Sequence, residues 1–147
     1  MALEITYSLL HNKVPKSALN EKSLALVCYI EGSLSIYQDS LLFFDEPMPL
    51  LELGAHLYRW LFLHGATTKF TYLSMEHDEP ILVFTQMNGK LWVIDSIWRK
   101  CDPLHVTQQE LMSVITQFLA RLDRDLQAEY GLAIEPFSVR VPYLENE

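Results

Sequence analysis

The order of local sequence patterns predicts an α+β fold, with one antiparallel sheet of about five to six strands and two long helices on one face of it. Apolar residues that alternate with polar ones, or runs of β-branched and aromatic residues, form two groups of strands, and one long amphipathic segment follows each group. Short turns connect the strands within each group, and such turns join antiparallel strands because parallel neighbours need a longer crossover. The expected order is therefore β-β-β-α-β-β-β-α.

The first group of strands opens the chain. Residues 2–10 place apolar side chains at a spacing of two, as a half-buried strand requires. The polar segment 11–22 predicts a connecting loop. The apolar run 24–30 and the segment 34–44 predict further strands, joined by a hairpin turn at residues 31–33. Asp39 and Ser40 within the second segment predict either another tight turn, which would make a meander, or a bulge.

The first long helix is expected at residues 47–64. Residues 45–49 combine acids with prolines, and both are favoured in the first turn of a helix. From Leu50 onward apolar residues recur at helical spacing over a broad face, which indicates a helix that is mostly buried. Gly65 lies where a left-handed residue would end the helix.

The second group contains three strands, which we expect at residues 67–75, 81–85 and 91–98. Asn88 and Gly89 separate the last two of these strands, and Asn-Gly is the strongest short-range hairpin signal in a sequence. The second and third strands of this group should therefore pair antiparallel.

The second long helix should begin after Thr107. Glu110 follows three residues later, which completes the capping-box pattern, and Gly131 supplies the stop. Residues 99–106 are expected to form a loop before this helix. Residues 132–147 contain prolines and are expected to dock on the domain as an extended C-terminal tail.

The composition indicates a single domain that spans residues 1–147. Half of the residues (50%) are hydrophobic, and 147 residues can form a core without disulfides or metals. The formal net charge of −8 has the wrong sign for a protein that neutralises phosphates, so we do not expect nucleic acid as a ligand.

The apolar runs are too short for a membrane span. Two cysteines and no recognisable leader favour the cytoplasm.

Acidic residues are concentrated in the centre of the chain. Between Ser23 and Trp98 there are nine acids and three bases, a net charge of −6. Acids on predicted turns can accelerate encounter with a basic partner, although solubility and the helix dipole explain some of the same residues. Tryptophan is the residue type most enriched at interface hot spots. The candidate partner-binding residues are Asp45, Glu46, Glu76, Asp78, Glu79, Trp92 and Trp98.

The last predicted strand is apolar on both faces. Trp92, Ile94 and Trp98 share one face of it, whereas Asp95 lies on the other face with apolar neighbours. If the helices cover one face, the tryptophan face must be covered by the tail, by a loop or by a partner.

Motifs for catalysis and cofactor binding do not stand out. The five glycines form no nucleophile elbow, phosphate-binding loop or dinucleotide fingerprint, so we expect neither an enzyme nor a cofactor. Cys101 and His105 are four residues apart, but Pro103 disfavours a helix between them and no second pair completes a zinc site. No metal is expected. His77 lies among acids in a predicted turn, where solvation is a simpler role than that of a general base.

Several segments together resemble small bacterial domains grouped with the immunity proteins of polymorphic and contact-dependent growth inhibition toxin systems. The likeness extends over residues 23–125 and is a pattern of strands, one helix and aromatic residues. It is carried by residues 30–36, 43–44, 49–53 with Trp60, and 78–82 leading to Trp92 and Trp98. The resemblance implies a single cytoplasmic domain that binds and blocks a cognate toxin, often a nuclease.

Two other functions are compatible with the sequence. The first is a small-ligand-binding or enzymatic domain, with a pocket between the sheet and the helix at 47–64 that uses Glu52, His56 or Asp95. Glu52, His56 and Arg59 form a polar stripe on that helix, which we interpret as a solvated helix face. The second is a structural homodimer that pairs the tryptophan faces, so the protein is expected to be a monomer or a homodimer.

Overall fold

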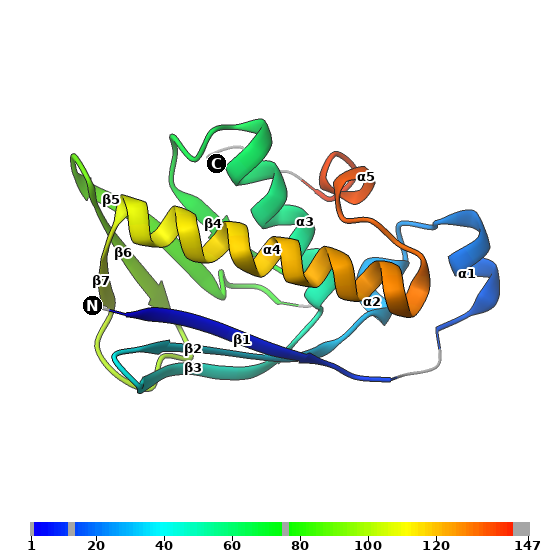
Figure 1. The fold of residues 1–147 in the computed structure, drawn as a ribbon, viewed down its shortest axis with the longest axis horizontal. Coiled ribbons are helices and arrows are strands. Elements are labelled where there is room, and N and C mark those ends of the chain that lie inside the picture. Colours follow the sequence, from blue (N-terminus) through cyan, green and yellow to red (C-terminus); the bar gives the residue numbers. More distant parts are fainter. Residues whose placement is uncertain (1, 12–13, 75–76, 143–147) are drawn as a thin grey trace.

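The computed structural model describes residues 2–11, 14–74 and 77–142. The α+β class is confirmed, but the strands form two antiparallel sheets, one of three strands and one of four, instead of the single predicted sheet. The two sheets and the helices enclose a common hydrophobic core. Figure 1 shows the longest helix crossing over the first sheet, with the second sheet at one end of the molecule.

The first sheet has the order β1-β2-β3. Its strands are β1 (Leu3–Leu9), β2 (Gly32–Gln38) and β3 (Leu41–Met48), and both neighbouring pairs are antiparallel. Asp39 and Ser40 connect β2 to β3 with positive φ angles of 51° and 68°. Two consecutive residues of this kind form the tight turn that matches the twist of a hairpin.

Two short helices replace elements that the sequence patterns predicted differently. Helix α1 (Lys16–Glu21) lies within the predicted loop, and helix α2 (Leu26–Tyr29) lies within the predicted strand at 24–30. The apolar run was misread because a short buried helix and a short buried strand have the same composition, and periodicity does not separate them. The turn predicted at residues 31–33 is therefore wrong, since β2 begins at Gly32.

The predicted helix after residue 47 is confirmed in its centre and shifted at its start. Helix α3 (Leu50–Tyr58) continues directly into a π-helical turn, η1 (Arg59–Leu63). Asp45, Glu46 and Pro47 belong to strand β3, where Glu46 pairs with Leu34 of β2, whereas Pro49 is the N-cap residue of α3. The acids and prolines of residues 45–49 favoured a helix start, but pairing with β2 makes residues 45–48 part of a strand.

The second sheet has the order β4-β5-β6-β7. Strands β5 (Leu82–Asn88) and β6 (Leu91–Ser96) form the predicted antiparallel hairpin, and β4 (Phe70–Tyr72) is a shorter version of the predicted first strand. Strand β7 (Leu104–Thr107) lies in the segment predicted as loop. Four residues are too few for an alternating pattern to be recognised.

Helix α4 (Gln108–Tyr130) begins and ends as predicted. The Oγ1 atom of Thr107 accepts a hydrogen bond from the backbone N–H of Glu110 at 3.1 Å, and Gly131 ends the helix with a φ of 69°. The segment after it docks on the domain but is not extended, because it contains the short helix α5 (Glu135–Ser138). Four apolar side chains of this segment are buried, namely Leu132, Ile134, Phe137 and Val141.

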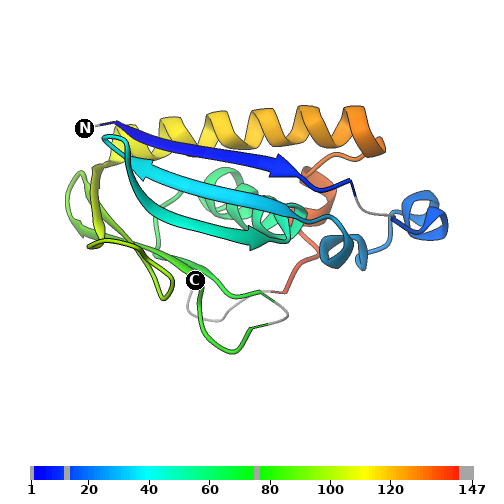
Figure 2. The same cartoon turned by 90° about the horizontal axis from the view of Figure 1, so that it is seen from below.

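The core lies between the helices and the inner faces of both sheets. Figures 1 and 2 show α3 and α4 on the same side of the first sheet. Trp92 and Ile94 of β6 are 0% and 1% exposed, and the Trp92 ring lies 5.6 Å from the ring of Trp60 in η1. The tryptophan face of β6 is therefore the core face, and the outward face carries Leu91 and Ile97, which are 44% and 50% exposed. The sequence pattern left the cover of this face open between the tail, a loop and a partner, whereas Trp92 packs against Trp60 of η1.

Candidate functional site

The turn that follows β6 holds Trp98 at the edge of the core, half-buried. The backbone N–H of Trp98 donates to the Oγ of Ser96 at 3.0 Å, and the N–H of Ser96 donates to the Oδ1 of Asp95 at 2.7 Å. These short side-chain contacts replace the ladder hydrogen bonds that end with the strand. They fix the direction in which the Trp98 ring leaves the turn.

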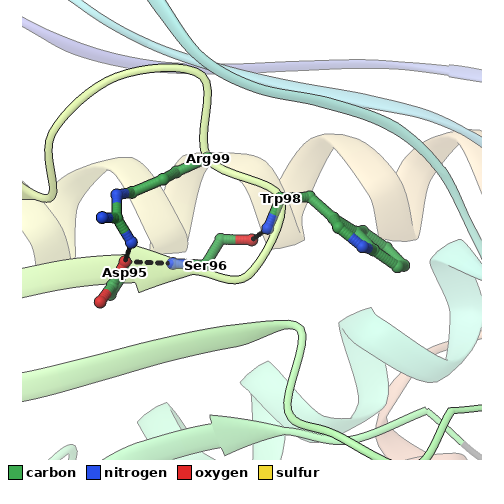
Figure 3. Close-up of polar contacts among 4 residues, drawn as sticks. All are labelled: Asp95, Ser96, Trp98 and Arg99. Carbon is green, nitrogen blue, oxygen red and sulfur yellow. Dashed lines mark hydrogen bonds and ion pairs between the residues drawn. The ribbon is translucent and has the colours of Figure 1, made fainter.

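Asp95 and Arg99 form an ion pair on the other side of this turn. The Nη1 of Arg99 lies 3.2 Å from the Oδ1 of Asp95, and both side chains are nearly half exposed. Figure 3 shows this pair on one side of the turn and the Trp98 ring pointing away from it. Exposed ion pairs contribute little to stability, so the main effect of the pair is that Arg99 neutralises the charge of Asp95 on that side of the turn.

Two aromatic side chains from other elements hold the Trp98 ring. Phe44 of β3 stacks on it with a centroid separation of 6.4 Å, and His77 meets it edge to face at 5.2 Å. The N–H of Lys100 also donates to the carbonyl of Phe43 at 2.8 Å. The turn after β6 thus fastens the second sheet to strand β3 of the first sheet, and Trp98 lies at that junction.

Acidic residues are close, along the chain or along the strand, to the two side chains that contact Trp98. Asp78 and Glu79 are exposed and follow His77 directly in the chain. Glu46 is half-buried and lies on the same side of β3 as Phe44, because side chains alternate along a strand. The arrangement is a half-buried aromatic anchor with acidic residues next to the groups that hold it. We call this group the Trp98 site, and it consists of Phe44, Glu46, His77, Asp78, Glu79 and Trp98.

The remaining predicted partner-binding residues do not join this group. Trp92 is enclosed in the core, so its side chain has no surface to offer a partner. Asp45 points to the outer face of the first sheet, where its Oδ1 accepts a hydrogen bond from the Oγ of Ser35 at 2.9 Å. Glu76 lies outside the described residues.

His77 is held by its ring and by its backbone. Its N–H donates to the carbonyl of Ser74 at 3.1 Å. Its Nδ1 is buried, and within the described parts of the chain this atom has no hydrogen-bond partner. The contact with Trp98 shows that the ring is not freely solvated, which differs from the expectation for a turn among acids.

A second polar group is enclosed within the molecule. We call it the buried polar cluster, and it consists of Glu52, His56, Arg59 and Tyr72, all 5% exposed or less. The hydroxyl of Tyr72 donates to the Oε1 of Glu52 at 2.7 Å, and the Nη2 of Arg59 lies 3.3 Å from the Nδ1 of His56. The prediction of a solvated stripe is wrong. Helix α3 is apolar on most of its circumference and is buried, so its polar residues are buried with it.

Arg59 connects the buried polar cluster to the C-terminal segment. Its guanidinium donates to the carbonyls of Ser138, Val141 and Pro142 at 3.4, 2.7 and 2.9 Å. Burial and the positive charge of Arg59 lower the pKa of His56 to about 4, so its imidazole is neutral at pH 7. Glu52, His56, Arg59 and Tyr72 are thus all buried, and Arg59 is bonded to the C-terminal segment. The arrangement as it stands fixes structure.

The described residues offer little for metal or membrane binding. Among residues 2–11, 14–74 and 77–142, no three His, Cys, Asp or Glu side chains are grouped closely enough to hold a metal ion. Cys28 and Cys101 are both half-buried thiols, and neither is part of a disulfide. In the same parts of the chain, every helix is too short or too polar to cross a bilayer.

The fold defines a small α+β domain in which two antiparallel sheets and two long helices share a core. The family model of DUF7878, described as a domain of unknown function, matches residues 5–128, and the chain belongs to that family. No curated protein and no solved structure matches the chain. The matched residues include the whole Trp98 site, whereas helix α5 lies beyond them.

Proposed function

We propose that this protein is a bacterial cytoplasmic immunity protein that binds and neutralises a cognate toxin, in the first instance a nuclease, through the Trp98 site. The observation that carries the proposal is a half-buried tryptophan at the junction of the two sheets, held by Phe44 and His77. Asp78 and Glu79 follow His77 directly in the chain, and Glu46 lies on the same side of β3 as Phe44. An aromatic anchor surrounded by charged residues is a common composition for a protein-binding hot spot.

The charge of the Trp98 site suits a nuclease as the target. A nuclease binds phosphates with basic residues, and carboxylates can occupy the same positions. The protein's net charge of −8 would attract such a basic surface over a distance of about one Debye length, roughly 8–10 Å at physiological salt. The acids would then accelerate encounter, and Trp98 would provide the apolar contact that keeps the complex together.

The test uses the toxin domain encoded immediately upstream of this protein. Co-expression should protect cells from that domain, and the purified chain should bind it directly. Loss of protection with Trp98→Ala, but not with Tyr29→Ala, would support the proposal, because Tyr29 is an aromatic residue that is 43% exposed on a different element. If the wild-type protein neither binds nor protects, the proposal fails.

A second pair of variants separates specific contact from overall charge. Asp78→Lys with Glu79→Lys changes the net charge by four units at the Trp98 site, and Glu4→Lys with Glu21→Lys makes the same change at exposed positions on β1 and α1. We expect only the first pair to abolish protection. Equal loss with both pairs would mean that net charge alone drives binding, which would contradict the proposed site.

A further inference from the structure

A surface hollow of about 360 Å³ lies between the end of α3, η1, helix α4 and the start of α5. Figure 1 shows these helices meeting on the side of the molecule away from the first sheet. One wall is the aromatic pair of Tyr58 and Phe62, whose ring centroids are 4.7 Å apart. Leu119 of α4 forms the opposite wall, and Ile134 lies at the base. We call this hollow the helical groove.

The π-helical turn extends the apolar surface beyond the groove. Phe62 and Leu63 are neighbours in η1 and are 52% and 49% exposed, so this turn presents two large apolar side chains to solvent. A π-turn inserts an extra residue per turn and redirects the side chains that follow, and such turns are frequent at functional sites.

Two carboxylates lie at the polar end of the groove. The Oδ1 of Asp123 accepts from the N–H of Ile134, and its Oδ2 accepts from the Nε2 of Gln127, both at 2.9 Å. These bonds hold the carboxylate in place while each oxygen keeps a further lone pair. Burial raises the pKa of Tyr58, and the charges of Glu135 and Asp123 raise it further, which places both acids near the Tyr58 hydroxyl.

The groove therefore combines an apolar strip with fixed negative charge. Among the described residues that line it, none is basic. We propose that the helical groove binds a basic amphipathic segment of another protein, which packs an apolar side chain against Phe62 and Leu119 and directs a Lys or Arg toward Asp123 and Glu135. Apolar anchors at helical spacing in a hydrophobic groove are a recurrent mode of peptide recognition. Aromatic walls also favour a cation.

This surface is separate from the Trp98 site, so the inference does not depend on the proposed function. The probe is a synthetic amphipathic peptide of about 18 residues, long enough to form a helix on binding, with Leu on one face and Lys and Arg on the other. Two control peptides are used. The first has the same composition in scrambled order, and the second has Glu in place of the basic residues. Fluorescence anisotropy with the full chain should give at least about tenfold tighter binding for the probe than for either control.

Variants of the protein then locate the peptide. Phe62→Ala and Glu135→Gln should each weaken binding of the probe by about fivefold or more, whereas Leu41→Ala and Glu79→Gln should leave it unchanged. Leu41 is 61% exposed at the start of β3, and Glu79 belongs to the Trp98 site, so they are matched controls. Circular dichroism melts verify that each variant is folded. Equal binding of the scrambled peptide, or equal loss with Glu79→Gln, would overturn the proposal.

Discussion

The buried polar cluster and the Trp98 site contain the same kinds of residue, a histidine, carboxylates and an aromatic ring, and differ in their access to water. In the cluster, Glu52 and Arg59 are 1% and 5% exposed and are bonded to other protein groups. In the Trp98 site, Asp78 and Glu79 are exposed to solvent. An ionised group without water must have partners inside the protein, whereas an exposed acid keeps its hydration and is available to a ligand.

Burial, more than residue type, therefore decides whether a polar group stabilises the fold or contacts other molecules. A substitution in the buried polar cluster should change the free energy of unfolding. A substitution of an acid in the Trp98 site should change binding while stability stays nearly constant. Each of the following experiments tests one side of that contrast.

The largest effect is expected for Arg59→Met. The variant keeps much of the side-chain volume but removes the donors to the carbonyls of Ser138, Val141 and Pro142. A hydrogen bond to a charged group contributes about 1.5–3 kcal/mol, so loss of the bonds to these three carbonyls should cost about 3 kcal/mol or more. Urea denaturation should show this loss, while Arg124→Met, at an exposed position, should change stability by less than about 0.5 kcal/mol. Similar small changes in both variants would mean that Arg59 does not hold the C-terminal segment.

The second effect is a pH dependence that His56 imposes on stability. The pKa of His56 is about 4 in the folded protein and about 6.5 when unfolded. Below pH 6.5 the unfolded chain therefore binds a proton that the folded protein does not, so stability falls as the pH is lowered from about 6.5 to about 4. The full difference is on the order of 3 kcal/mol.

The control for this dependence is another histidine. His56→Gln should flatten the stability profile between pH 6.5 and 5, where few carboxylates titrate, and His105→Gln should leave it unchanged because His105 is exposed on β7. Thermal melts over this pH range measure both. A wild-type profile that is flat from pH 7 to 5 would contradict the lowered pKa of His56.

A smaller loss is expected for Tyr72→Phe. The substitution removes only the hydroxyl that donates to Glu52 at 2.7 Å, and leaves a buried carboxylate oxygen without that partner. An unsatisfied buried acceptor costs about 1–3 kcal/mol. Tyr29→Phe is the matched control on the exposed surface and should be neutral. If Tyr72→Phe is equally neutral in denaturant titrations, the hydrogen bond to Glu52 does not stabilise the fold.

Local signals predicted those parts of the fold in which a few neighbouring residues determine the backbone. Asn88 and Gly89 specified the β5–β6 hairpin, and Thr107 with Glu110 specified the start of α4. Side-chain caps and positive φ angles act over three or four residues, so a sequence window contains all the relevant information.

The errors arose where distant residues decide. The apolar run at 24–30 is a helix, and strand β7 exists because it pairs with β6. The Trp98 site was predicted in part, since its acids and Trp98 were candidates, but their proximity depends on Phe44 and His77 from other elements. The burial of Trp92 depends on which face the helices cover. A sequence window contains none of these contacts.

The smallest effect on stability is expected at the Trp98 site itself. Asp78→Lys with Glu79→Lys should change the free energy of unfolding by less than about 0.5 kcal/mol per position, because both residues are exposed in a loop.

In complex with the toxin domain, charges at the rim of an interface act mainly on encounter. The association rate should therefore fall by about tenfold or more, while the dissociation rate changes little. Surface plasmon resonance at low and high salt separates the two rates, and the difference in association should shrink as salt screens the charges. A change confined to the dissociation rate would mean that Asp78 and Glu79 are desolvated inside the interface. Exposed acids that steer a partner and buried groups that stabilise the fold would then no longer be distinct.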